Sequence, residues 1–187
     1  MDPISQAFTR IKRTDFLPVE AHRFAFVDAP LSIGHGQTNS QPSTVRAMLK
    51  LLDVQPGHRV LDVGAGSGWS SALLGHLVGS HGEVIGVERI PELVDLARAA
   101  NARQGQPWVQ VRQAIEGALG APEEAPFDRI LVSAMAHALP EQLVEQLGES
   151  GVMVVPVADE MLRVRRRQKG VKVTRHGQFR FVPLRED

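Results

Sequence analysis

Short apolar segments alternate with amphipathic ones along most of this chain, from residue 42 onward. Five apolar segments of strand length predict strands at 59–63, 83–87, 108–111, 128–132 and 151–157. Apolar residues at helical spacing predict helices at 45–52, 69–78, 91–104 and 140–147. Strands that alternate with helices indicate a parallel sheet with helices on both faces, and nearly uniform apolar strands agree because both of their faces are buried.

The two ends of the chain follow different patterns. Before residue 42, residues 4–11 predict one short helix, whereas glycines and prolines predict a loop at 31–42. After residue 161, alternation at 163–167, a turn at Lys169–Gly170 and an apolar segment at 179–184 predict antiparallel strands at one sheet edge. We therefore predict a single doubly wound, mostly parallel α/β domain over 1–187. It comprises an extension (1–42) with a substrate or lid loop, a cofactor-binding core (43–157) and edge strands (158–187).

Composition narrows the possible functions. The 187 residues carry 21 Lys and Arg against 21 Asp and Glu, so the formal net charge is zero. This balance gives no whole-chain attraction for nucleic acid. We interpret the basic run at 163–169 as a solvated strand face and turn, with a phosphate-binding patch as the alternative. The absence of cysteine excludes disulfides, thiolate metal sites and cysteine nucleophiles, and no histidine pair has the spacing of a metal site.

Because neither a membrane span nor a signal peptide is recognised, the sequence gives only a default expectation of location. No stretch approaches the ~20 apolar residues of a membrane span, and the amino-terminal residues lack the pattern of a signal peptide. We therefore expect a cytoplasmic protein with no metal, membrane or nucleic-acid partner.

Three alternating glycines follow the strand predicted at 59–63. Gly64, Gly66 and Gly68 allow positive φ and close approach of a ligand, at the sheet edge where doubly wound folds bind nucleotides. This spacing is shorter than the G-x-G-x-x-G of dinucleotide binders, so it suits an adenosyl ligand without a pyrophosphate. A plain tight turn is the alternative. The pattern predicts a site for S-adenosylmethionine, with S-adenosylhomocysteine as product.

Two acids accompany this turn. Glu88 ends the next predicted strand, twenty residues after Gly68, where a carboxylate can accept hydrogen bonds from both ribose hydroxyls. Asp62, within the preceding strand, could hold the amino acid part of the cofactor. The alternative for Glu88 is a surface acid paired with Arg89.

Several segments resemble the protein-L-isoaspartate O-methyltransferase family. The most specific is 30–42, Pro-Leu-Ser-Ile-Gly-His-Gly-Gln-Thr-Asn-Ser-Gln-Pro; the others are 60–68, 87–93, 125–132, 151–157 and 181–184. The resemblance implies methyl transfer from S-adenosylmethionine to the α-carboxylate of L-isoaspartyl residues in damaged proteins. The ester then closes to a succinimide, whose hydrolysis partly restores aspartate.

The resemblance also implies roles for particular residues. Ser40 would lie beside the transferred methyl and the substrate carboxylate. The residues implied in cofactor binding are Asp62, Gly64, Ala65, Gly66, Gly68, Glu88, Arg89, Glu116 and Gly117. The residues implied in substrate binding are Gln37, Thr38, Val182 and Pro183. No general base is expected, because a carboxylate nucleophile with a pKa near ~4 is already ionised at neutral pH.

The chain departs from the family's pattern at four places. Asn39 replaces an isoleucine or valine, and Ile115-Glu116-Gly117 replaces Gly-Asp-Gly. Residues 158–161, Ala-Asp-Glu-Met, replace a segment with glycine followed by glutamine, and the amino-terminal helical region is short. Two alternatives therefore stay open: a methyltransferase for another carboxylate, and a non-catalytic module that binds S-adenosylmethionine.

Overall fold

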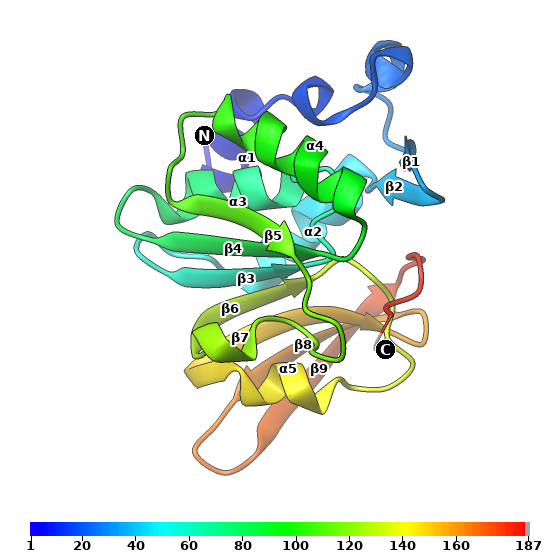
Figure 1. Cartoon of the computed structure of the whole chain (residues 1–187). Helices are drawn as coiled ribbons and strands as arrows, with labels where there is room; N and C mark the ends of the chain where they lie inside the picture. The colour runs from blue at the N-terminus through cyan, green and yellow to red at the C-terminus, as the bar shows by residue number, and fades with distance from the viewer. Residues whose placement is uncertain (186–187) are drawn as a thin grey trace.

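Seven strands form one sheet at the centre of the molecule in the computed structural model, which describes residues 1–185 (Figure 1). The order across the sheet is β5-β4-β3-β6-β7-β8-β9. The strands are β3 (Arg59–Val63), β4 (Glu83–Glu88), β5 (Val109–Gln113), β6 (Phe127–Val132), β7 (Leu147–Val157), β8 (Glu160–Arg166) and β9 (Val171–Gln178). Strands β3 to β7 pair in parallel, whereas β8 is antiparallel to β7 and β9 to β8. The predicted doubly wound fold with antiparallel edge strands is confirmed.

Helices cover the two faces unequally. The helices are α1 (Pro3–Arg10), α2 (Pro42–Leu52), α3 (Trp69–Val78), α4 (Pro91–Ala102) and α5 (Glu141–Glu145), with short 3-10 turns η1 (Arg13–Phe16), η2 (Val19–Phe24) and η3 (Pro122–Glu124). One apolar cluster joins α1, α2 and α3 to one face of the sheet, and α4 packs on that face beside β5. A second cluster joins α5 and the 114–126 segment to the other face. Adjacent strand residues such as Ile130 and Leu131 enter opposite clusters, which explains the unbroken apolar strands.

The prediction of an irregular loop at 31–42 is wrong. Residues Leu31–Gly34 (β1) and Gln37–Asn39 (β2) form an antiparallel hairpin. Its tight turn uses positive φ at Gly34, His35 and Gly36. The glycines that suggested irregular backbone are therefore those that permit the turn of a hairpin.

Two predictions near the carboxyl end also need correction. Helix α5 stops at Glu145, because Leu147 already pairs with Phe127 as the first residue of β7. The closing strand is Val171–Gln178; residues 179–184 leave the sheet and contribute only an isolated bridge between Pro183 and Met135. This segment crosses instead to the carboxyl end of β6. The basic run lies in strand β8 and the turn after it, but its strand face is not simply solvated: Arg163 Nε donates to Leu51 O at 2.7 Å, and Arg166 Nη1 donates to Leu147 O at 2.6 Å.

Candidate active site

Polar residues gather where the sheet changes its winding direction. From β3 the chain adds β4 and β5 on one side, and it then returns to add β6 and β7 on the other. In open α/β sheets, ligands bind outside the carboxyl ends of the strands at this point. The Gly64–Gly68 turn follows β3, Glu88 ends β4 and Ser133 follows β6. The predicted cofactor residues therefore meet at one edge of the sheet.

The glycine turn combines open backbone with tight packing. Gly64, Gly66 and Gly68 all have positive φ, at 77°, 55° and 89°. A Cβ on Gly64 would make only ordinary van der Waals contact, 3.8 Å from Ala134 Cβ, so the positive φ is the reason for glycine there. A Cβ on Gly68 would lie 2.3 Å from Asn101 Nδ2, because α4 packs directly against the start of α3. Glycine at the first position thus serves the backbone conformation, whereas glycine at the last position also allows two helices to meet.

Glu88 is held by backbone amides on both sides. Its side chain is 8% exposed; Oε2 accepts a hydrogen bond from Gly66 N at 2.9 Å, and Oε1 accepts one from Ile90 N at 3.0 Å. A carboxylate has about four lone-pair sites, so both oxygens keep acceptor capacity. The turn and the start of α4 therefore fix a carboxylate that can accept two further hydroxyl donors.

Asp62 is a fully buried carboxylate with an incomplete set of partners. Ser70 and Ser71 hydroxyls donate to its Oδ2 at 2.7 Å and 2.6 Å, whereas Oδ1 is buried and has no partner within residues 1–185. Burial, with a contribution from the charge of Glu88, raises the pKa of Asp62 to about 6 against the opposing serine hydrogen bonds. An unpartnered buried carboxylate oxygen fits a cationic donor such as the ammonium of an amino acid.

The raised pKa of Asp62 predicts a pH-dependent stability. Because the folded-state pKa lies above the ordinary value of 3.8, ionisation disfavours the folded state as pH rises toward about 6. We expect the melting temperature of Asp62→Asn, relative to the unchanged protein, to rise between pH 5 and pH 7 in thermal unfolding without cofactor. Asp95→Asn, at a side chain that is 81% exposed, is the control and should show no such trend. A difference for Asp62→Asn that is equal at both pH values would contradict this origin.

The β1–β2 hairpin packs over the glycine turn. Ile33, which is 4% exposed, lies against Gly66, and Asn39 lies against Ser67. A small cavity of about 40 Å³ remains between the two segments. Its lining comprises Thr38, Asn39, Ser40, Val45, Met48, Gly64, Ala65, Gly66, Ser67, Trp69, Ser70, Leu131 and Ser133. Ser40 therefore shares one cavity with residues of the glycine turn.

A buried arginine that the sequence did not single out organises this region. Arg13 is 6% exposed, forms no ion pair within residues 1–185, and lies 5.4 Å from the centre of the Trp69 ring. Its guanidinium donates to the backbone carbonyls of Ala25, Val27, Ala29, Asn39 and Ser40 and to Asn39 Oδ1. Burial lowers its pKa, although Asp28 opposes the shift. No sequence signal identified it, because nearly all of its acceptors are backbone atoms.

Some predicted cofactor residues lie outside the cavity. Arg89 is exposed directly after β4. Glu116 and Gly117 form an exposed turn after β5, on the same sheet edge, and Ala114 N donates to Glu88 O at 2.8 Å near its start. The backbone just before this turn is therefore hydrogen-bonded to the end of β4, where Glu88 lies.

The predicted substrate residues are divided between two segments. Thr38 lines the cavity, whereas Gln37 is half-buried and donates to His35 O. Val182 and Pro183 lie beside the segment that follows β6, where Val182 O accepts a hydrogen bond from Met135 N at 2.8 Å. Some backbone hydrogen-bonding groups of this segment are therefore already paired within the protein.

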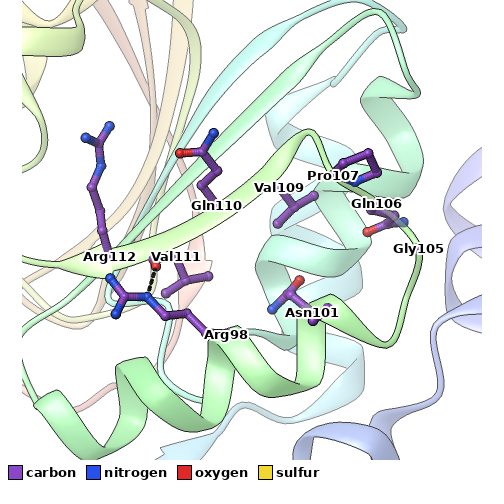
Figure 2. A pocket seen from close by; sticks show the side chains of 10 residues that line it. Arg98, Asn101, Gly105, Gln106, Pro107, Val109, Gln110, Val111 and Arg112 are labelled. Carbon is purple, nitrogen blue, oxygen red and sulfur yellow. Dashed lines mark hydrogen bonds between the residues drawn. The ribbon is translucent and has the colours of Figure 1, made fainter.

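A larger hollow lies away from this chemistry. Its volume is about 590 Å³, and it opens between α4 and the edge strand β5 (Figure 2). Arg98 crosses it and donates to Val111 O at 2.8 Å. None of the predicted site residues lines it. We therefore assign the candidate site to the smaller cavity beside the glycine turn.

Within residues 1–185, no group of three or more His, Asp or Glu side chains is placed to hold a metal ion. None of the helices in that range is long and apolar enough to cross a bilayer.

The doubly wound sheet, the glycine turn and the acid on the neighbouring strand define the class of S-adenosylmethionine-dependent methyltransferases. The family model for protein-L-isoaspartate(D-aspartate) O-methyltransferase matches residues 1–187. The chain belongs to this family.

Individual relatives agree with this assignment. A protein-L-isoaspartate O-methyltransferase of Methanopyrus kandleri is 45% identical over 186 residues, which cover 97% of this chain and 82% of the relative. The enzyme of that name from Methanococcoides burtonii is 41% identical over 97% of this chain and 91% of its own. A Plasmodium falciparum structure, described as a beta-aspartate methyltransferase in complex with S-adenosyl-L-homocysteine, matches with a TM-score of 0.88 and 25% identity. That match covers 100% of this chain and 92% of the other.

Proposed function

We propose that this chain transfers a methyl group from S-adenosylmethionine to the α-carboxylate of L-isoaspartyl residues in damaged proteins. The observation that carries the proposal is that Ser40 and the glycine turn line one cavity. The family model and the relatives are named for this reaction. The proposal is supported because Ser40 lies in the same cavity as Gly64, Ala65 and Gly66.

The residues at the sheet edge fit S-adenosylmethionine. When bound, this molecule supplies an electrophilic methyl group on a positively charged sulfur. Glu88 would accept the ribose hydroxyls with its remaining lone pairs, and the unpartnered Oδ1 of Asp62 would accept from the ammonium. The backbone of Gly64 and Gly66, which lines the cavity, would lie against the cofactor. We place Ala65, Gly68, Arg89, Glu116 and Gly117 around it as the sequence predicts.

On the substrate side, orientation matters more than proton transfer. The attacking carboxylate is ionised at neutral pH, so the protein needs to align it and to exclude water. Within residues 1–185 the Ser40 hydroxyl forms no hydrogen bond, and it is therefore free to donate to that carboxylate. Gln37, Thr38, Val182 and Pro183 would hold the flanking peptide in extended form.

The decisive test compares two peptides. Labelled S-adenosylmethionine is incubated with the protein and an isoaspartyl peptide, beside the same peptide with normal aspartate. Base-labile labelling of the isoaspartyl peptide alone is expected. Labelling of both peptides would favour a broader carboxylate methyltransferase, and tight cofactor binding without labelling of either would favour a non-catalytic module.

Replacement of Ser40 by alanine tests the substrate side. We expect kcat to fall roughly ten-fold, because one hydrogen bond contributes about 0.5–1.5 kcal/mol, more when its acceptor is charged. The affinity for S-adenosylhomocysteine should stay unchanged. Ser80→Ala, at an exposed loop serine, is the matched control. Unchanged kcat in Ser40→Ala would remove this residue from the reaction.

A further inference from the structure

Asn39 is a buried polar residue directly before Ser40. It is 4% exposed and ends strand β2. Its Oδ1 accepts a hydrogen bond from Arg13 Nε at 2.8 Å, and its Nδ2 donates to Ser67 Oγ at 3.3 Å. Ser67 is itself 5% exposed and lies between Gly66 and Gly68. One amide therefore joins the hairpin that carries Ser40 to the turn that faces the cofactor.

Arg13 fixes the direction of this connection. A guanidinium has only donors and stays charged, so the Asn39 oxygen must face Arg13 and the Asn39 amino group must face Ser67. The Nη2 atom of Arg13 also donates to the backbone oxygens of Asn39 at 3.1 Å and Ser40 at 3.0 Å. The side chain of Asn39 and the backbone of Ser40 are thus held by the same group.

The connection from Asn39 through Ser67 continues to Glu88, the carboxylate that we propose binds the ribose. Ser67 follows Gly66, whose amide donates to Glu88 Oε2 at 2.9 Å. Four members of this series, Asn39, Ser40, Gly66 and Ser67, line the same small cavity. A network that only stabilised the hairpin would not need to end at the ligand-facing turn, since any backbone carbonyl could satisfy the Asn39 amino group.

We infer that Asn39 is a positioning residue that couples the cofactor turn to Ser40, through Ser67 on one side and Arg13 on the other. This inference rests on the proposed function. Cofactor binding at the turn then orders the β1–β2 hairpin, and the hairpin in turn places Ser40 against the substrate. The residue acts through its neighbours and needs no contact with the methyl group.

A double-mutant cycle tests the coupling in the full-length protein. The variants are Asn39→Leu, Ser67→Ala and the pair, with Asn39→Asp as the conservative replacement. Asn39→Leu should lower kcat on an isoaspartyl peptide by ~10- to 100-fold, because small displacements of a positioning group carry costs of this size. The KM for the peptide should change less than ~3-fold. Asn39→Asp keeps an acceptor for Arg13 and accepts from the Ser67 hydroxyl, so it should retain kcat within ~3-fold.

The pair should be no slower than Asn39→Leu alone, since both changes break the same connection. Melting temperatures of all four variants identify any that fail to fold. Ser67→Ala leaves the contacts of Arg13 intact, and its loss of kcat therefore reports on the connection without disturbing the buried cation. Multiplicative losses in the pair, or full kcat in Asn39→Leu, would overturn the inference.

A second measurement needs no substrate. S-adenosylhomocysteine should slow backbone amide hydrogen exchange in residues 31–40 of the unchanged protein, and it should do so much less in Asn39→Leu and Ser67→Ala. Equal protection in all three proteins would overturn the coupling even if methylation proceeds. Loss of protection only in the variants would support the coupling even if the isoaspartyl peptide is not the substrate.

Discussion

Replacement of Glu88 by glutamine is expected to weaken binding of S-adenosylhomocysteine by about 100-fold, as measured by calorimetry. Hydrogen bonds to a charged group contribute roughly 1.5–3 kcal/mol each, and two ribose hydroxyls would lose the charged acceptor together. A loss of about 3 kcal/mol corresponds to about 100-fold in Kd. The glutamine amino group would also oppose the amide of either Gly66 or Ile90, which now donates to the carboxylate.

Glu92→Gln provides the matched control for this prediction. Glu92 is an exposed acid four residues further along the chain, in the first turn of α4. Its replacement removes the same charge from the same end of the sheet, and it should change Kd less than about two-fold because surface charges are screened. Equal weakening by both changes would indicate a general electrostatic effect, and would argue against a direct contact between Glu88 and the ribose.

Replacement of Gly68 by alanine should lower the free energy of unfolding by about 3–4 kcal/mol. The new Cβ would lie 2.3 Å from Asn101 Nδ2 and 3.2 Å from the backbone Cα of Ala97. Overpacking of this kind costs about 1–3 kcal/mol, and the positive φ of 89° adds about 1–2 kcal/mol for a residue with a side chain. Thermal unfolding should show a fall in Tm of roughly 10 °C.

Gly105→Ala separates the two causes. Gly105 has a comparable φ of 67°, but no atom lies within 4 Å of the position of its missing Cβ. Only the conformational cost remains there, so the loss should be about 1–2 kcal/mol. If Gly105→Ala destabilised the protein as much as Gly68→Ala, close packing between α3 and α4 would not be the reason for glycine at 68.

The central sheet could be predicted because each parallel strand is apolar on both faces. Strand β3 and helix α3 have the predicted limits, since Gly64 to Gly68 separates them without ambiguity. The hairpin at 31–39 was missed for a physical reason. Its short strands bury only alternate residues, Ile33 and Asn39 among them, and one of the two is polar. The limits of α5 were missed because pairing of Leu147 with Phe127 overrides local helix preference.

The part of the candidate site that lies at the ends of neighbouring strands could be predicted from the sequence. Asp62, the glycine turn and Glu88 come together because β3 and β4 are adjacent and parallel. The role of Arg13 could not be predicted from the sequence. Its acceptors are carbonyls that lie 12 to 27 residues away, and the sequence does not record where a carbonyl points. The side chain of Asn39 is understood only once Arg13 and Ser67 are seen on its two sides.

The buried guanidinium of Arg13 has a consequence for the order of assembly on the ribosome. Chains emerge from the amino end, so residues 13–40 leave the ribosome before Ser67 and Trp69 do. Until then the carbonyls that surround Arg13 stay hydrated, since the ring of Trp69 at 5.4 Å and the amide contact to Ser67 at 3.3 Å are missing. The hairpin that carries Ser40 therefore lacks two of its supporting contacts, those with Ser67 and Trp69, until the segment after the first core strand has also emerged.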